Sequence, residues 1–201
     1  MQKHRTYVLS LALIGILTAL SLVFLAILPG IPLFPAADFL KYDAMDIPIL
    51  IGAFIMGAPS GMAILLIGSA FQSFVYGHNG IVGFAMHVIA SGALLLVSSL
   101  VYRHYRSRRA LVAGLVLGCL AMTLTMIFFN YLVTGPYLEA LGVANARALV
   151  HKLMLPAIVP FNLIKAGINA LITGILVFAL EPQINRLQRR VGLRVIQSHK
   201  A

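Results

Sequence analysis

Three polar residues in one apolar segment are the side chains of this sequence best suited to hold a small molecule. Asn162, Lys165 and Asn169 interrupt the otherwise hydrophobic stretch 156–180. Spacings of three and four residues place them on one helical face. Amides donate and accept hydrogen bonds while an ammonium only donates, so this face suits a neutral heteroaromatic solute with a hydrogen-bonding edge. The alternative is structural: a lysine that reaches an aqueous interface and asparagines that join neighbouring helices.

Two other places can contribute to the same site. Asn130 lies near the end of the apolar stretch 110–133, and we expect it at a depth similar to that of Asn162. Taken alone, Asn130 is explained equally well by a hydrogen bond between helices as by a role in the site. The loop 29–45 carries Phe39 and Tyr42, and we expect it to act as a lid over the site. Its alternative interpretation is an interfacial loop whose aromatic residues belong to the aromatic belt of a membrane protein.

No sequence pattern indicates catalysis. The chain contains neither a GxxxxGK phosphate-binding loop nor an HExxH motif, and no recognisable Ser/His/Asp arrangement. The single cysteine, Cys119, lies within an apolar run, and we interpret His87 as a core histidine without a role. We therefore predict that the protein is not an enzyme and uses no metal or cofactor. Any ATP-driven step must be performed by a partner protein.

The composition indicates the kind of protein that positions these residues. Hydrophobic residues make up 61% of the 201-residue chain and charged residues 10%, against about 45–50% and about 25% in ordinary soluble domains. Apolar stretches such as 7–28 and 110–129 are long enough to cross a hydrocarbon layer of roughly 30 Å. We predict an all-α integral membrane protein whose solvent is the lipid bilayer.

Apolar runs, separated by proline, glycine and charged residues, predict six transmembrane helices. The segment 47–76 is too long for one crossing, and the Gly-Ala-Pro-Ser-Gly sequence at 57–61 divides it in two. The expected helices span 7–28, 46–57, 60–76, 81–102, 110–133 and 156–180. We expect 1–181 to form the membrane domain and 182–201 a basic cytoplasmic tail.

The distribution of basic residues orients these helices. The net charge of +10 comes from Lys and Arg at the N-terminus, in the loop 103–109 and after residue 181. Six crossings place all three regions on one side, which the positive-inside rule makes cytoplasmic. Both termini are therefore expected in the cytoplasm. Because the basic residues cluster at helix ends and do not alternate with aromatic residues on a soluble face, they do not indicate nucleic-acid binding.

The first helix carries a strip of small residues. Ala12, Gly15 and Ala19 recur at helical spacing, which lets another helix approach closely. Spacing alone leaves open whether that helix is internal or belongs to a partner subunit.

Several motifs resemble those of one transporter family. The sequence FLKYDAMDIP at 39–48, followed by GAF at 52–54 and the 57–61 break, resembles the S components of energy-coupling factor (ECF) vitamin transporters. The sequence PFNLIK at 160–165 is similar to the riboflavin-binding members in particular. The resemblance covers the first through the sixth helix. Ala58 is a departure, because the family commonly continues glycine directly into proline.

The resemblance implies a six-helix subunit of the bacterial cytoplasmic membrane that captures riboflavin at the outer side. It would work with a transmembrane coupling protein and two cytoplasmic ATPases. The flavin-contacting roles of the family map onto Asn130, Asn162 and Lys165. The strip that meets the coupling protein matches Gly15 and Ala19, with Ala12 adjoining. A role for Asn169 follows from spacing alone.

Two alternative functions stay open. The same polar residues also suit an S component for another small vitamin or base. A stand-alone secondary carrier would normally place an acidic residue or a histidine within the membrane core. We expect the acidic residues at helix ends, with Asp46 capping the second helix, and this argues against a carrier.

Overall fold

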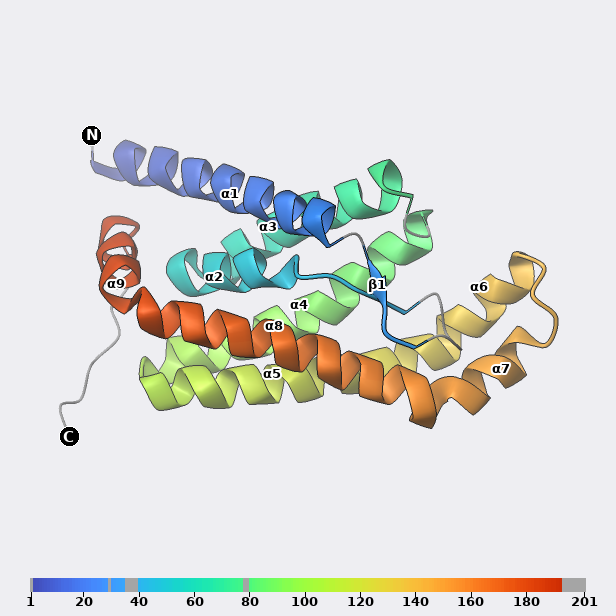
Figure 1. The fold of residues 1–201 in the computed structure, drawn as a ribbon. Coiled ribbons are helices and arrows are strands. Elements are labelled where there is room, and N and C mark those ends of the chain that lie inside the picture. Colours follow the sequence, from blue (N-terminus) through green and yellow to red (C-terminus); the bar gives the residue numbers. More distant parts are fainter. Residues whose placement is uncertain (1, 29, 35–39, 78–79, 193–201) are drawn as a thin grey trace.

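The computed structural model describes residues 2–28, 30–34, 40–77 and 80–192, which form an elongated helical bundle (Figure 1). Its α-helices are α1 Gln2–Ile27, α2 Asp46–Met56, α3 Ala58–Ala70, α4 Gly80–Tyr105, α5 Arg108–Phe129, α6 Gly135–Ala140, α7 Ala146–Leu153, α8 Val159–Ala179 and α9 Glu181–Arg190. Three π-helical turns, η1 Phe71–Val75, η2 Asn130–Thr134 and η3 Met154–Ile158, extend α3 and α5 and precede α8. The short strands β1 Ile31–Pro32 and β2 Lys41–Tyr42 pair antiparallel.

The all-α membrane architecture is confirmed. Five continuous helical spans are long and apolar enough to cross a membrane: Thr6–Ile27, Ala58–Val75, Gly80–Tyr105, Arg108–Ala140 and Ala146–Ala179. The remaining predicted helix corresponds to α2, an apolar helix of 11 residues. At about 1.5 Å per residue, α2 is about half as long as a 30 Å hydrocarbon core. Length and composition therefore support five spans and one shorter apolar helix.

The break between α2 and α3 lies where the sequence predicted it. Gly57 has a φ of 97°, a conformation open to glycine and strained for other residues. Its N–H donates to the carbonyl of Ala53 and ends α2, and Pro59 occupies the first turn of α3. Proline is tolerated there because the first-turn N–H groups of a helix have no intrahelical acceptor.

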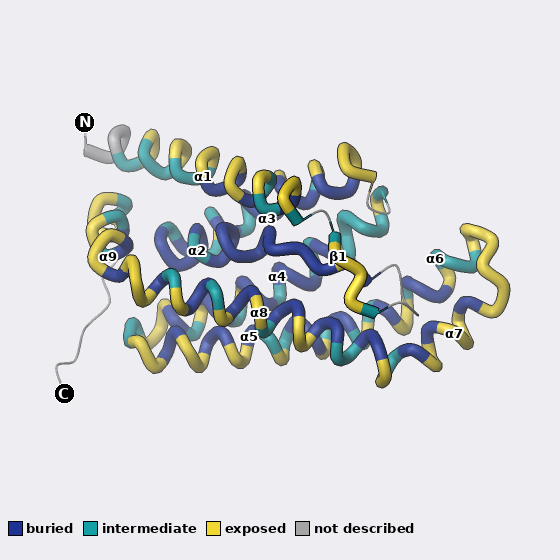
Figure 2. Tube along the Cα trace, in the orientation of Figure 1, coloured by how far each residue is buried: buried dark blue, intermediate teal, exposed yellow. Residues whose placement is uncertain are grey.

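Helices α4 and α5 pack closely against each other. A Cβ atom placed on Gly118 would lie 2.8 Å from the carbonyl oxygen of Leu94, so only glycine fits between these backbones. The bundle interior is apolar, with fully buried side chains such as Phe54, Leu94 and Leu111. Figure 2 shows buried residues lining the inward faces of the helices and exposed residues on the outward faces.

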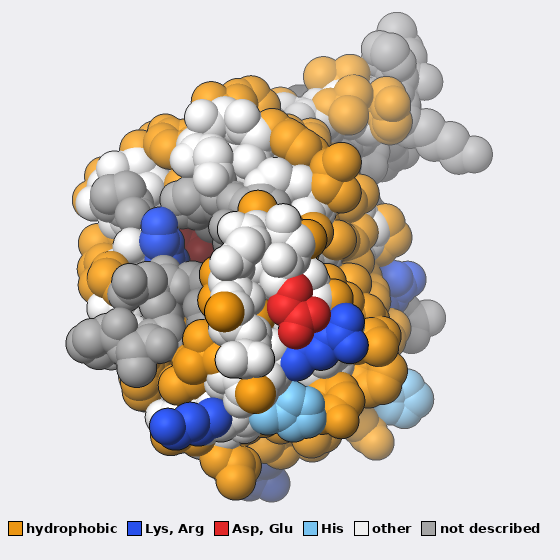
Figure 3. Space-filling view, turned by 90° about the vertical axis from the view of Figure 1, so that its right-hand side faces the viewer, with side chains coloured by type: hydrophobic (Ala, Val, Ile, Leu, Met, Phe, Trp, Pro, Cys, Tyr) orange, Lys and Arg blue, Asp and Glu red, His pale blue; other side chains and the backbone are white. Residues whose placement is uncertain are grey.

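The two ends of the bundle differ. The start of α1, the α4–α5 turn and α9 lie at one end, and the β1–β2 ribbon, α6 and α7 lie at the other (Figure 1). Viewed from the α6–α7 end, hydrophobic side chains cover much of the flank, while Lys, Arg, Asp, Glu and His side chains gather on the end face (Figure 3). We call the end that carries α9 the α9 end, and the end that carries the β1–β2 ribbon, α6 and α7 the ribbon end.

Helices α6, α7 and α9 were not predicted from the sequence. Helices α6 and α7 fold the segment expected to be a loop, and Arg147 of α7 forms an ion pair of 2.8 Å with Glu139 of α6. Helix α9 lies within the expected basic tail, and its Gln188 is buried. Gln188 donates to the carbonyl of Phe54 at 2.8 Å, so this part of the tail packs on the bundle. Residues 193–201 lie outside the described part of the chain.

Candidate binding site

A cavity of about 360 Å³ lies near the ribbon end, where β2 and α6 contribute to its lining. Its volume is within the range of about 300–1,000 Å³ typical of small-molecule sites. Its walls come from β2, η1, α4, α5, η2, α6 and α8. The polar lining residues include Asp43, Gln72, Ser73, His87, Asn130, Thr134, Asn162 and Lys165. The apolar lining residues include Val82, Met86, Met122, Met126 and Phe161. The cavity thus combines an apolar chamber with a few convergent polar groups.

The structure brings Asn130 and Asn162 together on the cavity wall. Each is 2% exposed, and each donates its side-chain N–H to a carbonyl four residues earlier, at 2.8 Å. Asn130 begins the π-helical turn η2, and Asn162 follows η3 by one turn. Such turns interrupt the regular helix and are frequent at functional sites. The bonds to their own helices fix the orientation of both amides toward the chamber.

Lys165 also lines the cavity, and it is paired. Its ammonium Nζ lies 2.8 Å from Oδ2 of Asp43, and the two side chains are 8% and 3% exposed. Gln72 of η1 donates to the same carboxylate oxygen at 3.1 Å. The other oxygen, Oδ1, accepts the backbone N–H of Met45 at 3.3 Å. The buried lysine is therefore neutralised by the segment that precedes α2.

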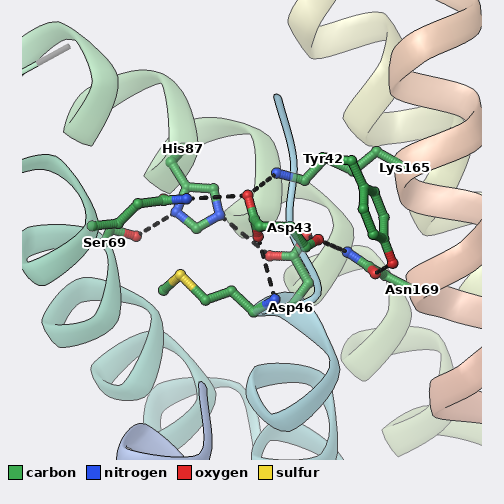
Figure 4. Close-up of polar contacts among 9 residues, drawn as sticks. Tyr42, Asp43, Asp46, Ser69, His87, Lys165 and Asn169 are labelled. Atoms are coloured by element: carbon green, nitrogen blue, oxygen red, sulfur yellow. Dashed lines mark hydrogen bonds and ion pairs between the residues drawn. The ribbon is translucent and has the colours of Figure 1, made fainter. Parts of the chain in front are cut away.

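Asn169 lies one helical turn further along α8 and binds that same segment (Figure 4). Its Nδ2 donates to the carbonyl of Asp43 at 3.2 Å and to Oδ2 of Asp46 at 3.1 Å. Its Oδ1 accepts from the hydroxyl of Tyr42 at 3.0 Å. The described residues that line the cavity include neither Asn169 nor Tyr42. The contact of Asn169 and Tyr42 with a ligand stays a prediction. In the structure, the hydrogen bonds of these two residues connect β2 and the start of α2 to α8.

Tyr42 lies outside the membrane-spanning helices. Burial is the main cause that raises the pKa of its phenol above the ordinary value, and the Asp43 carboxylate beside it adds to the increase. The phenol is therefore a stable hydrogen-bond donor to Asn169 at neutral pH. Phe39, predicted beside Tyr42 as a ligand contact, lies outside the described residues.

A second polar chain continues from Asp46 into α4 (Figure 4). Oδ1 of Asp46 lies 3.5 Å from Nε2 of His87, and Nδ1 of His87 is hydrogen-bonded to the hydroxyl of Ser69 at 2.8 Å. Asp46 does not occupy the capping position expected for it, because Met45 is the N-cap and Asp46 lies in the first turn of α2. The acidic side chain turns into the protein instead.

A family model described as "ECF transporter, substrate-specific component" matches residues 9–177. The chain belongs to this family. The riboflavin transporter RibU of Streptococcus thermophilus is 31% identical over 159 residues, covering 77% of this chain and 74% of that protein. The riboflavin transporter FmnP of Bacillus subtilis is 26% identical over 185 residues, covering 88% and 94%.

The fold agrees with this membership. A solved structure of the S component of a bacterial ECF transporter is similar with a TM-score of 0.72 and 25% sequence identity. The similarity covers 88% of this chain and 98% of that one.

The acidic half of the S component's polar network was not predicted from the sequence. The acidic residues were expected at helix ends, and Asp46 does lie in the first turn of α2. Their burial was not expected: Asp43 and Asp46 are 2% and 1% exposed. The physical reason is that α2 begins inside the bundle, against α8 and α4. One available signal was Lys165 itself, because an intramembrane lysine normally pairs with an acidic group. His87, expected to have no role, lines the cavity and belongs to the same network.

The small residues of α1 in this S component face outward. Ala12, Gly15 and Ala19 are exposed, and no atom of the described neighbouring residues lies within 4 Å of a Cβ placed on Gly15. Leu17 and Thr18, on the opposite face, are buried against the bundle. The strip is thus accessible to the bilayer or to another subunit.

Proposed function

We propose that this S component binds riboflavin in the ribbon-end cavity and is the substrate-binding subunit of an ATP-driven uptake transporter in the bacterial cytoplasmic membrane. The observation that carries the proposal is the convergence of Asn130, Asn162 and Lys165 on one cavity wall. Relatives that are riboflavin transporters support it. Riboflavin enters as the transported ligand and not as a cofactor.

The chemistry of the cavity matches the two halves of a flavin ring. One edge of the ring carries carbonyl acceptors and an N–H donor, and amides such as Asn130 and Asn162 can pair with both kinds of group. Lys165 supplies a further donor to a ring carbonyl. The dimethylbenzene half is apolar and matches the methionine side chains at 122 and 126.

We further propose that α2, although shorter than the hydrocarbon core, forms the sixth crossing. In this topology the α9 end, which carries arginines of the α4–α5 turn and of α9, faces the cytoplasm with both termini. The positive-inside rule supports this orientation. The cavity then opens toward the outer side, where the vitamin is captured.

The proposed ATP-driven step requires partners, because the sequence contains no nucleotide-binding loop of its own. We propose a transmembrane coupling protein, whose helices would meet Ala12, Gly15 and Ala19, and two cytoplasmic ATPases. The outward orientation of this strip supports the assignment. Small residues allow the close helix approach that stabilises contacts within a bilayer.

Purification in detergent tests the ligand assignment. We expect a yellow chromophore to copurify, and we expect the ligand-free protein to quench riboflavin fluorescence with saturation at one flavin per chain. Other vitamins added as competitors should not displace riboflavin. A monodisperse protein that fails to bind riboflavin, but binds one of those competitors, would instead identify an S component for another solute.

A further inference from the structure

The cavity contains a buried lysine, yet its electrostatic character is set by the residues around that lysine. An unpaired ammonium in an apolar chamber would attract any anion of suitable shape. Here Nζ of Lys165 lies 2.8 Å from Oδ2 of Asp43, and Asp43 itself lines the cavity. A ligand in the chamber therefore meets both charges, and the field of one offsets that of the other.

Asp43 is held in place from several directions. Gln72 donates to Oδ2 at 3.1 Å, and the N–H of Met45 donates to Oδ1 at 3.3 Å. Asn169 binds the backbone carbonyl of Asp43 at 3.2 Å. A carboxylate fixed by η1, by the start of α2 and by α8 cannot easily turn away when a ligand enters.

The charged and titratable groups nearest this pair come from β2, α2 and α4. Asp46, at the start of α2, adds a second buried carboxylate, and it faces His87 of α4. Lys41 of β2 lines the cavity and is exposed. Near the cavity, two buried carboxylates, those of Asp43 and Asp46, therefore lie close to one buried lysine and one buried histidine.

We propose that Asp43 determines the charge selectivity of the cavity: by pairing with Lys165 it disfavours an anionic ring and selects a neutral one. The identity of the ring rests on the proposed function; the role of Asp43 does not. Selectivity of this kind arises because a fixed carboxylate repels the competing anion while leaving hydrogen bonds to the neutral ligand intact. Coulomb interactions between charges a few ångströms apart are strong enough to discriminate at least tenfold.

Two flavins of nearly the same shape provide the test. Riboflavin has a neutral ring at neutral pH, and 8-demethyl-8-hydroxyriboflavin has an anionic one. Both are titrated into wild type and Asp43→Asn, and the ratio of their affinities is compared. We expect wild type to prefer riboflavin and D43N to lower that preference by at least about tenfold. A ratio within about twofold of wild type overturns the proposal.

Asp46→Asn is the matched control. It removes a buried carboxylate of the same network that does not line the cavity, and we expect it to change the ratio by less than about threefold. An equal shift in D46N and D43N would assign the effect to net charge and overturn the role of Asp43. If D43N does not purify as a monodisperse protein, Asp43→Ser decides. Serine also removes the carboxylate but keeps a hydrogen-bond acceptor for Gln72, so the preference should again fall at least about tenfold, and an unchanged ratio overturns the proposal.

A measurement without flavin separates this proposal from the ligand assignment. Thiocyanate should raise the thermal unfolding temperature of D43N saturably, because Lys165 is left without its carboxylate, and should not do so for wild type or for D43N/K165M. Equal responses of wild type and D43N would overturn the proposal. If wild type binds neither flavin, the riboflavin assignment fails, and the thiocyanate response still decides the role of Asp43.

Discussion

Buried polar contacts hold helices together at each end of this bundle, but the contacts at the two ends differ in charge. At the ribbon end, Lys165 and Asp43 form a charge pair on the wall of a cavity. At the α9 end, the neutral amide of Gln188 bonds the carbonyl of Phe54 and the hydroxyl of Tyr102. The ion pair at this end, between Arg108 and Glu181, differs from the Lys165–Asp43 pair because its arginine is exposed. Phe54 lies in the last turn of α2, where helix carbonyls lack partners.

This difference suits two roles, stabilisation of the fold at the α9 end and selection of the ligand at the ribbon end. A neutral amide can pair with a helix-end carbonyl that would otherwise lack a partner, and this stabilises the fold without burying a charge. A buried charge pair is a poor way to stabilise a fold, because the desolvation of both ions offsets their attraction. Its presence beside the cavity is better explained by ligand selection. Four substitutions examine the comparison.

Lys165→Met should have the largest effect on stability. It removes the partner of Asp43 and leaves a buried carboxylate uncompensated, which typically destabilises a protein by about 3–5 kcal/mol. Thermal unfolding in detergent measures the loss. The double substitution D43N/K165M should recover much of it, since no buried charge is then left unpaired. A single variant as stable as wild type would show that the pair is not buried in the way described.

Asn162→Leu should mainly affect binding. A leucine leaves the polar edge of the flavin unpaired, at a cost of about 1–3 kcal/mol, so riboflavin affinity should fall roughly five- to 150-fold. Fluorescence titration gives the affinity, and size-exclusion chromatography checks that the variant is folded. Affinity within about twofold of wild type would mean that the amide is structural and that the ligand contacts another wall.

Gln188→Met tests the α9 end. The substitution keeps most of the side-chain volume and removes the amide donor to Phe54, so stability should fall by about 1 kcal/mol. Riboflavin affinity should stay within about twofold, because α9 does not contribute to the described cavity lining. If affinity fell as far as in the Asn162 variant, the two ends would be coupled and the assignment of two separate roles would be wrong.

Gly15→Leu should have the smallest effect on the isolated subunit. A Cβ at Gly15 meets open space among the described residues, so neither stability nor flavin binding should change measurably. Assembly with the coupling protein and ATPases should weaken, as measured by copurification. Exposed Ile16, the next residue, offers a matched control as Ile16→Leu. Normal assembly of the Gly15 variant would place the partner surface elsewhere.

The sequence by itself determined the features that depend on local pattern. Apolar runs predicted the all-α membrane class, and the Gly-Ala-Pro-Ser-Gly segment predicted the break that Gly57 and Pro59 form. Helical periodicity placed Asn162 and Lys165 on one face, and both lie on the cavity wall. These features follow from transfer free energies, from backbone conformation and from helix geometry, which act between residues close in sequence.

Only the tertiary structure decided which groups face one another. Asp43 and Lys165 are 122 positions apart, and Tyr42 and Asn169 are 127 apart. No local pattern indicates such pairs, because they depend on how α2 and α8 pack and on where α2 begins within the bundle. The same packing separated Asn169 from the cavity although it shares a helical face with Lys165. A helical face is broad, and the neighbouring elements determine which part of it meets the ligand and which part meets protein.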